Sequence, residues 1–167
     1  MELKRRRFVA AFINTIIIFA VFLLRFCGIA TLQIGDAVPL LLIPIVISVS
    51  IFFGENAALM SALFAGLLMD CAAADTSCFN TVFFVLGATA CGVMANRFLN
   101  RNLKAAICLS LGLSFIYFIL KYIIFFVFSG IAVNYDYFIL YLIPSAVYTA
   151  LWIIPFYFLQ KKLSNYQ

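Results

Sequence analysis

The chain begins MELKRRR (Met1–Arg7) and continues FVAAFINTIIIFAVFLLRF (Phe8–Phe26), so a basic cluster directly precedes a long apolar segment. A segment of about 20 apolar residues is long enough to cross the hydrocarbon core of a bilayer as a helix. This one exceeds the apolar core of a usual secretory signal, and no small-x-small cleavage site follows it. We therefore expect an uncleaved membrane anchor whose N-terminal end lies in the cytoplasm.

The composition of the whole chain extends this expectation to every apolar segment. Of the 167 residues, 67% are hydrophobic and 10% are charged, whereas a soluble domain is about half apolar and a quarter charged. The apolar segments are continuous and lack the alternation of a membrane β-barrel, which favours helices. We predict an all-α integral membrane protein, a transmembrane-helix bundle that forms a single domain over residues 1–167.

The distribution of Lys and Arg predicts how the chain crosses the bilayer. Nine of the eleven lie before the first apolar segment, in one mid-chain break or after the last apolar segment, and the breaks between hold Asp but no base. Because basic loops stay in the cytoplasm, we predict six spans with both termini cytoplasmic. The second and third spans are short, and a re-entrant pair is the alternative for them. The predicted helices cover residues 8–26, 39–53, 57–69, 80–96, 105–128 and 137–159.

The charges and cysteines also bear on the class of function. The net charge of +5 comes from helix ends on one side, which indicates membrane orientation and argues against nucleic-acid binding. The chain has no His, no Ser-centred elbow and no metal-ligand spacing, so we expect no catalytic residue, no metal and no cofactor. Cys71 and Cys78 could form a disulfide or remain two free thiols.

Small residues predict a close contact between the third and fourth helices. Small side chains four residues apart share one helical face and let two backbones approach. Asp70 continues the same spacing on the third helix. Either these small residues serve only to pack the third and fourth helices together, or Asp70 also closes the outer end of this contact and presents a carboxylate to the outer face. The seam consists of Ala58, Ala62 and Gly66 on the third helix and Ala88, Gly92 and Asn96 on the fourth.

Arg25 and Lys121 are cations inside apolar segments, and Asp70 ends another. At about 1.5 Å of rise per residue, all three lie about 20–25 Å from the inner ends of their helices, in the outer part of the membrane. A charge at such depth favours a partner or a wet cavity. Two interpretations remain open. The cations could snorkel separately to the headgroups, or they could form an ionic cluster with Asp70 and Asp36 that pins three helices together.

Two polar-aromatic faces offer a possible outward pocket. The same side chains could equally make ordinary hydrogen bonds between helices, so the sequence leaves both interpretations open. The residues are Ser114 and Tyr117 on the fifth helix and Tyr141, Ser145, Tyr148 and Trp152 on the sixth.

The string Gly66-Leu67-Leu68-Met69-Asp70, six short helices and a basic start together resemble the rod shape-determining protein MreD family. In that family a Gly-Leu-Leu-x-Asp end of the third helix leads through a short loop, here Cys71 to Phe79, to a helix that Asn80 opens. Two positions depart from the family pattern. The chain has Cys78 where Gly is common, and Ala88-Thr89 where Gly-Tyr is common.

The resemblance implies a fold similar to the substrate-binding subunits of energy-coupling vitamin transporters. It implies a non-enzymatic subunit of the cell-wall elongation complex in the bacterial cytoplasmic membrane, involved in cell shape and peptidoglycan synthesis. The implied partners are an MreC-like bitopic protein and, in the wider complex, MreB, RodA and a transpeptidase. The competing expectation is a small-molecule binding subunit of a transporter, which needs a pocket with convergent polar groups.

Overall fold

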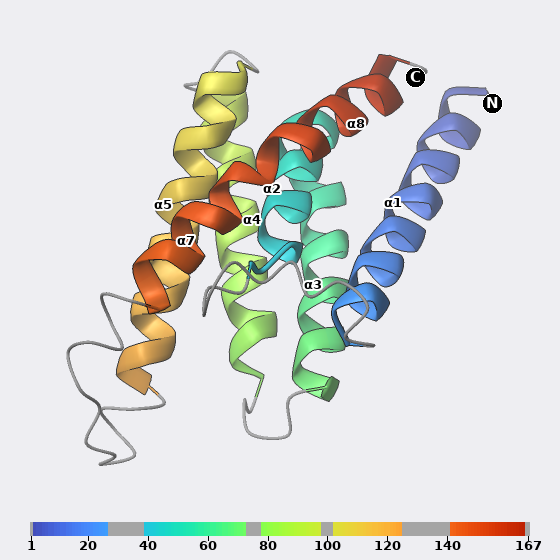
Figure 1. Cartoon of the computed structure of the whole chain (residues 1–167). Coiled ribbons are helices and arrows are strands. Elements are labelled where there is room, and N and C mark those ends of the chain that lie inside the picture. Colours follow the sequence, from blue (N-terminus) through green and yellow to red (C-terminus); the bar gives the residue numbers. More distant parts are fainter. Residues whose placement is uncertain (1, 27–38, 73–77, 98–101, 125–140, 166–167) are drawn as a thin grey trace.

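The structure, a computed structural model, describes residues 2–26, 39–72, 78–97, 102–124 and 141–165, and all regular structure within these ranges is helical. This agrees with the predicted all-α class. Figure 1 shows the helices side by side, with their long axes running between the two ends of the bundle. They are α1 (Glu2–Phe26), α2 (Leu42–Phe53), α3 (Glu55–Ala72), α4 (Phe79–Arg97), α5 (Leu103–Tyr122), α7 (Ile143–Leu151) and α8 (Ile153–Asn165).

Four helical segments in the described ranges are long and apolar enough to cross a membrane. They are Val9–Phe26, Glu55–Ala72, Leu103–Tyr122 and the combined α7 and α8, Ile143–Asn165. The apolar helices Leu42–Phe53 and Phe79–Ala95 are shorter. The structure is thus that of a helical membrane protein, and the count of six spans stays a prediction.

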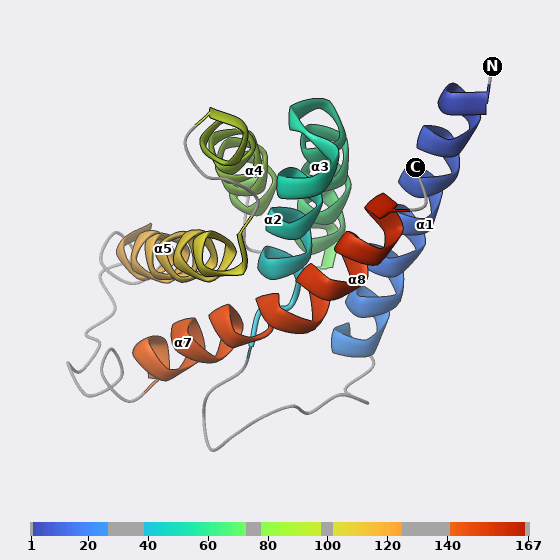
Figure 2. The same ribbon diagram turned by 90° about the horizontal axis from the view of Figure 1, so that it is seen from above.

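The short helix α2 forms the centre of the bundle. It carries no charged residue, and the ten residues from Leu42 to Ile51 are all buried. A helix that is apolar on every side is covered by protein or lipid on every side, and α2 contacts α1, α3, α4, α5, α7 and α8. Viewed from above, it lies between α3 and α4 on one side and α7 and α8 on the other (Figure 2). At 12 residues it rises only about 18 Å.

The chain enters α2 through buried backbone that is not helical. Arg25 Nη1 donates to the Pro39 carbonyl at 2.8 Å, and the Leu40 N–H donates to Thr149 Oγ1 at 3.0 Å. Irregular backbone at membrane depth is tolerated only where protein groups satisfy it. Side chains of α1 and α7 therefore fix the place where α2 begins.

A single glycine joins α2 to α3. Gly54 has φ of 82°, and a Cβ there would meet nothing within 4 Å, so the left-handed backbone, not crowding, requires glycine. Its carbonyl accepts the Ala58 N–H at 3.0 Å. The predicted turn at residues 54–56 is therefore shorter than expected, because Glu55 already belongs to the first turn of α3. An acidic residue is favourable there, and α3 gains the length that the predicted range 57–69 lacked.

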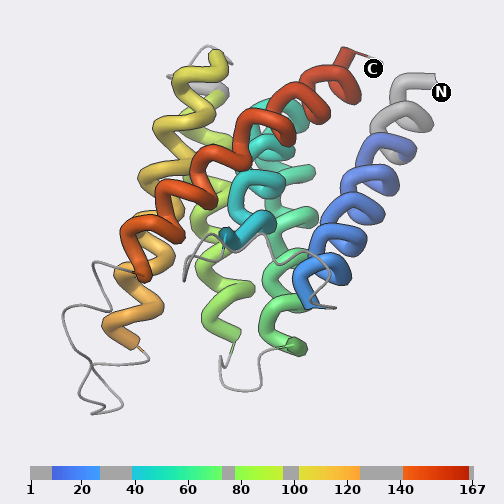
Figure 3. Tube along the Cα trace, viewed as in Figure 1, coloured from blue at the N-terminus to red at the C-terminus, as the bar shows by residue number. Residues whose placement is uncertain are grey.

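The last predicted helix, residues 137–159, is two helices in the part that the structure describes. Residues 137–140 lie outside the described ranges, α7 ends at Leu151, and α8 begins at Ile153 and continues to Asn165. Pro155 explains the break, because it has no N–H to donate to the Leu151 carbonyl and its ring crowds that carbonyl. Figure 3 shows the resulting bend, with α8 running on from α7 in a new direction.

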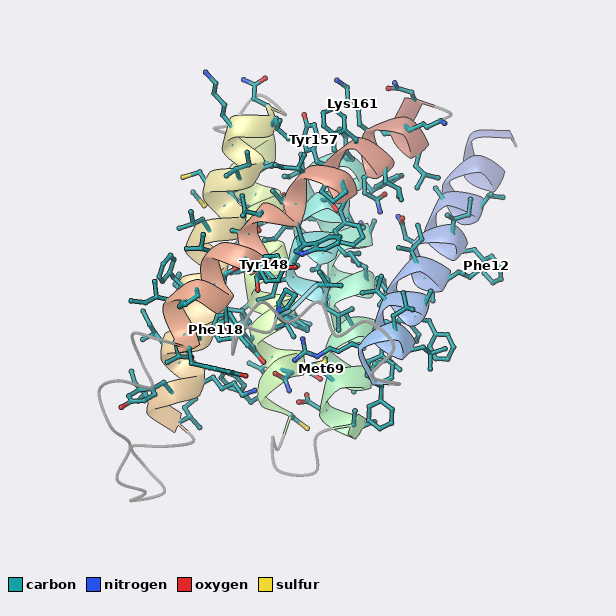
Figure 4. The ribbon with its side chains drawn as sticks, viewed as in Figure 1. Phe12, Met69, Phe118, Tyr148, Tyr157 and Lys161 are labelled. Atoms are coloured by element: carbon teal, nitrogen blue, oxygen red, sulfur yellow. The ribbon has the colours of Figure 1, made fainter. Side chains whose placement is uncertain are left out.

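Apart from Arg25 and Lys121, the basic residues in the described helices gather at one end of the bundle. The first turns of α1 and the last turns of α8 lie at the same end, together with the start of α5 (Figure 1). Lys104 lies in the first turn of α5, and Lys161 and Lys162 lie in the last turns of α8. In Figure 4, Lys161 and Met69 lie toward opposite ends, so the residues that follow Met69 are remote from this basic end.

Helix α1 is peripheral, and a buried amide pair ties it to the bundle. Most of its apolar side chains are exposed, including Phe12, which points away from the other helices (Figure 4). Asn14 and Gln160 are nevertheless buried, and Gln160 Nε2 donates to Asn14 Oδ1 at 2.9 Å. Such hydrogen bonds are a usual means of joining helices within a bilayer. The pair therefore joins α1 to α8, while α1 packs mainly against α3.

Candidate functional site

Asp70, in the last turn of α3, caps the first turn of α4. Asp70 Oδ1 accepts the Asn80 N–H at 3.1 Å and Nδ2 at 2.9 Å, and Oδ2 accepts the Thr81 N–H at 2.8 Å and Oγ1 at 2.6 Å. The first N–H groups of a helix have no partner within the helix, and negative charge is favourable beside them. A carboxylate from a neighbouring helix thus replaces the local cap of α4.

Gly66 lets α3 approach Thr81 of α4 closely. A Cβ at Gly66 would overlap the Cα of Thr81 and lie 3.0 Å from its nitrogen. Gly66 and Asp70 are four residues apart and so share one face of α3. The glycine and the aspartate of the Gly66–Asp70 string therefore meet Thr81 together, whereas Leu67 between them is exposed.

The other small residues of the predicted seam do not all face one another. Ala58 and Ala62 on α3 are fully buried, as is Ala88 on α4. A Cβ at Gly92 would lie 3.0 Å from Ser50 Oγ of α2 and 3.3 Å from Glu55 Cγ. Helix α4 therefore presents small residues to α2 and to the start of α3 as well. The side chain of Asn96 lies outside the described residues.

A hydrogen-bonded chain extends from Asp70 to α5. Asn80 Nδ2 donates to Asp70, and the Tyr117 hydroxyl donates to Asn80 Oδ1 at 2.8 Å. Tyr117 is 1% exposed, and a buried tyrosine hydroxyl needs such a partner. The chain links α3, α4 and α5 through side chains in apolar surroundings. The Tyr117 ring contacts Phe79, Phe83, Phe84 and Phe118.

The two cations predicted from depth lie near this tyrosine. Lys121 Nζ is 5.9 Å from the centroid of the Tyr117 ring, and Arg25 interacts electrostatically with both Tyr117 and Lys121. The structure thus brings Arg25, Lys121 and Asp70 into one neighbourhood, with Asp70 joined to it through Asn80. Direct pairing of Asp70 with either cation stays a prediction, and Asp36 lies outside the described residues.

The predicted pocket residues take several different positions. Tyr117 points into the phenylalanine cluster, and Tyr148 and Trp152 contact each other edge to face at 6.5 Å. Ser114 Oγ donates within its own helix to the Ser110 carbonyl at 2.7 Å. Tyr141 is half-buried, and Ser145 is fully buried. A pocket lined by these groups stays a prediction.

Some residues of the site were not predicted. Thr81 and Thr149 are polar residues whose partners are backbone groups or a distant carboxylate, and sequence spacing does not reveal such partners. Asn14 and Gln160 did carry a signal, because amides within apolar segments favour a hydrogen bond between helices.

The described residues contain no group of three or more His, Cys, Asp or Glu that could hold a metal ion. The thiols of Cys71, Cys78, Cys91 and Cys108 are free. Comparisons with protein-family models, curated proteins and solved structures give no match for this chain. The functional argument therefore rests on the residues themselves and on the resemblance carried by the Gly66–Asp70 string.

Gly66→Ala tests the close contact with Thr81. The added methyl has no room, so we expect a loss of about 1–3 kcal/mol in the free energy of unfolding. Gly112→Ala is the matched control, because a Cβ on Gly112 in α5 meets nothing within 4 Å, and alanine is the better helix former by up to about 1 kcal/mol. Thermal unfolding in mild detergent measures both variants. Equal midpoints for the two would contradict the contact.

Asp70→Asn tests the cap on α4. The amide keeps the shape but removes the charge, and its NH₂ group faces donors, so we expect unfolding to become easier by about 1–3 kcal/mol. Glu55→Gln is the control, since it makes the same chemical change at an exposed carboxylate. Chemical and thermal unfolding in detergent compare the two. If Glu55→Gln lowers the free energy of unfolding as much as Asp70→Asn does, the cap on α4 makes no specific contribution to stability.

Proposed function

We propose that the chain is a non-enzymatic membrane subunit of the bacterial cell-wall elongation complex, as its resemblance to the MreD family implies. It would contribute to cell shape by organising peptidoglycan synthesis. The observation that carries the proposal is the joint contact of Gly66 and Asp70 with Thr81. This contact gives a physical reason for a glycine and an aspartate four residues apart at the end of a membrane helix.

The bonding of Asp70 supports the non-enzymatic part of the proposal. Both of its carboxylate oxygens accept hydrogen bonds from the first turn of α4. A carboxylate that caps a helix stabilises the fold by accepting hydrogen bonds from the first N–H groups of that helix. The proposal therefore gives Asp70 a structural role, and the output of the subunit is the binding of other proteins.

The proposed location is the bacterial cytoplasmic membrane, with six spans and both termini in the cytoplasm. The proposed partners are an MreC-like bitopic protein and, with it, MreB, RodA and a transpeptidase. The gathering of Lys104, Lys161 and Lys162 at one end of the bundle supports this orientation, because basic residues remain on the cytoplasmic side.

The function is tested in rod-shaped cells that depend on this chain. We expect depletion to make the cells widen and round up, with recovery by the wild-type chain and by Glu55→Gln but not by Asp70→Asn at equal membrane abundance. Mild-detergent purification is expected to recover the bitopic partner with the wild-type chain. Unchanged cell width after depletion, with no elongation protein recovered, would refute the proposal.

A transporter subunit is the second candidate, and one observation favours it. Ser110 and Ser145 are fully buried, and among the described residues their hydroxyls have no hydrogen-bond partner. Unsatisfied buried hydroxyls are costly unless water or a ligand meets them. Mass spectrometry of the purified chain distinguishes the two functions, because a binding subunit retains a small polar molecule that the Ser145→Ala variant loses.

Orientation is tested with the exposed native thiol of Cys71, which lies at the Asp70 end of α3. In a variant whose other cysteines are serine, we expect a membrane-impermeant maleimide to label Cys71 from outside intact cells. The Lys161→Cys variant without native cysteines is expected to label only after the membrane is opened. The reverse pattern would invert the proposed topology.

A further inference from the structure

One side of α1 carries a stripe of large apolar side chains that the other described helices leave uncovered. Its six members are between 40% and 66% exposed. Four phenylalanines are exposed in the described part of the chain, and three of them belong to this stripe. Figure 2 shows α1 at the edge of the bundle, and Figure 4 shows Phe12 directed away from the other helices. The α1 stripe consists of Val9, Phe12, Ile16, Phe19, Leu23 and Phe26.

The spacing of the α1 stripe is that of a seam between two helices. Its members alternate between aliphatic residues and phenylalanines, at intervals of three and four residues, so each kind returns every seven residues. A neighbouring helix requires such a repeat, whereas fluid lipid tails do not. A seven-residue repeat winds slightly left-handed about its helix and suits a second helix that crosses at about 20°. Apart from Leu24, the other exposed residues of α1 are small and leave room for that helix: Ala11, Thr15 and Ala20.

The repeat is independent of the way in which α1 packs on its own bundle. The buried side of α1 has intervals of four, four and three residues, and it consists of Ala10, Asn14, Ile18 and Val21. A face that was exposed only because it lies opposite this side would keep step with the same intervals, and the α1 stripe does not. Helix α1 thus has two separate packing faces, and α2 and α3 occupy one of them.

The helix that fits the α1 stripe comes from another chain. The segment Val9–Phe26 has 18 residues, and a helix that covers all of it must be about as long. The longest stretch of this chain outside the described ranges, residues 125–140, is shorter. It also joins α5 to α7, whereas α1 packs on α2 and α3.

Charge distinguishes a second copy of this chain from a different protein. Helix α1 begins at Glu2, and four consecutive basic residues, Lys4 to Arg7, follow in its sequence. Arg5 stands four residues before Val9, at the next position of the repeat. Two copies inserted in the same direction would place their basic clusters side by side, and such like charges repel. A different helix with an acidic residue at that level is attracted instead.

We propose that the α1 stripe binds the single membrane-spanning helix of a bitopic partner, whose cytoplasmic flank carries an acidic residue opposite Arg5. The inference rests on the proposed function, which supplies a bitopic partner, and it adds the surface at which that partner binds. Packing of the alternating aliphatic and phenyl side chains stabilises the contact within the bilayer. The pair formed by Arg5 and the acidic residue sets the register of the two helices.

Photo-crosslinking tests the surface in the full chain. The photoreactive amino acid p-benzoylphenylalanine replaces Phe12 or Phe19 in cells that also produce an epitope-tagged bitopic partner. We expect a crosslinked product that contains the tag from both positions. The same amino acid at Leu86 is the control, because Leu86 is also exposed but belongs to α4, and no tagged product is expected from it.

The outcomes separate this inference from the proposed function. Crosslinks from the α1 stripe to a second copy of this chain, or to lipid alone, overturn the inference. A tagged product from Leu86 but not from the stripe overturns the surface and leaves the proposed function standing. If no position gives a tagged product and mild-detergent purification recovers no bitopic partner, both are refuted.

Phe19→Ala tests the contribution of the phenyl rings. Because Phe19 is exposed, we expect the unfolding midpoint of the isolated chain to stay unchanged. Titration with the purified partner in neutral detergent is expected to show an apparent affinity about tenfold weaker. Leu86→Ala is the matched control and should change neither quantity. An unchanged affinity with Phe19→Ala contradicts the stripe.

Arg5→Glu tests the choice of partner by charge. We expect about a tenfold loss of apparent affinity, which returns when the acidic residue in the flank of the partner is changed to Lys. Arg7→Glu is the control, because it makes the same change about 200° round the helix. Labelling of Cys71 from outside the cell verifies that both variants keep their orientation. Equal losses in the two variants, or no recovery with the reversed charges, overturn the proposed pair.

Discussion

The carboxylate of Asp70 engages the first turn of α4, and the placing of several other helices follows from that contact. A bilayer core offers no water to the free N–H groups at the start of a helix, so protein must supply their acceptors. Because the acceptor comes from α3, the cap also sets the position of α4 relative to α3. Asn80, held by the same carboxylate, then accepts the Tyr117 hydroxyl and so positions α5.

The centre of the bundle obeys the same requirement. Helix α2 is too short to carry its own start to a membrane surface, and Pro39 and Leu40, which lead into it, are buried backbone outside the helix. Arg25 from α1 and Thr149 from α7 satisfy two of these groups. Arg25 thus contributes to the fold by satisfying a carbonyl of the backbone that leads into α2.

The sequence was sufficient to predict the membrane class, the all-helical structure and most of the helices, because composition and apolar length depend directly on the bilayer. It could not show that α2 is central, since an apolar side chain is compatible with lipid and with protein alike. The sequence contains Pro155, which can break a helix, but only the structure shows that the helix divides just before it. Depth calculations brought Asp70 near Arg25 and Lys121, yet they could not reveal its partners, because backbone N–H groups of a helix start carry no formal charge.

The Gly66–Asp70 string gains its meaning from the dependence of one contact on the other. Asp70 can reach the N–H and hydroxyl of Thr81 only if α3 and α4 lie very close, and the missing side chain at Gly66 permits that approach. Conversely, the hydrogen bonds from Asn80 and Thr81 to Asp70 hold α3 and α4 so close together that position 66 has no room for a Cβ. Because four residues return to the same helical face, the two positions act on one point of α4. Gly66 and Asp70 therefore act together in joining α3 to α4, and each contributes much less to that contact without the other.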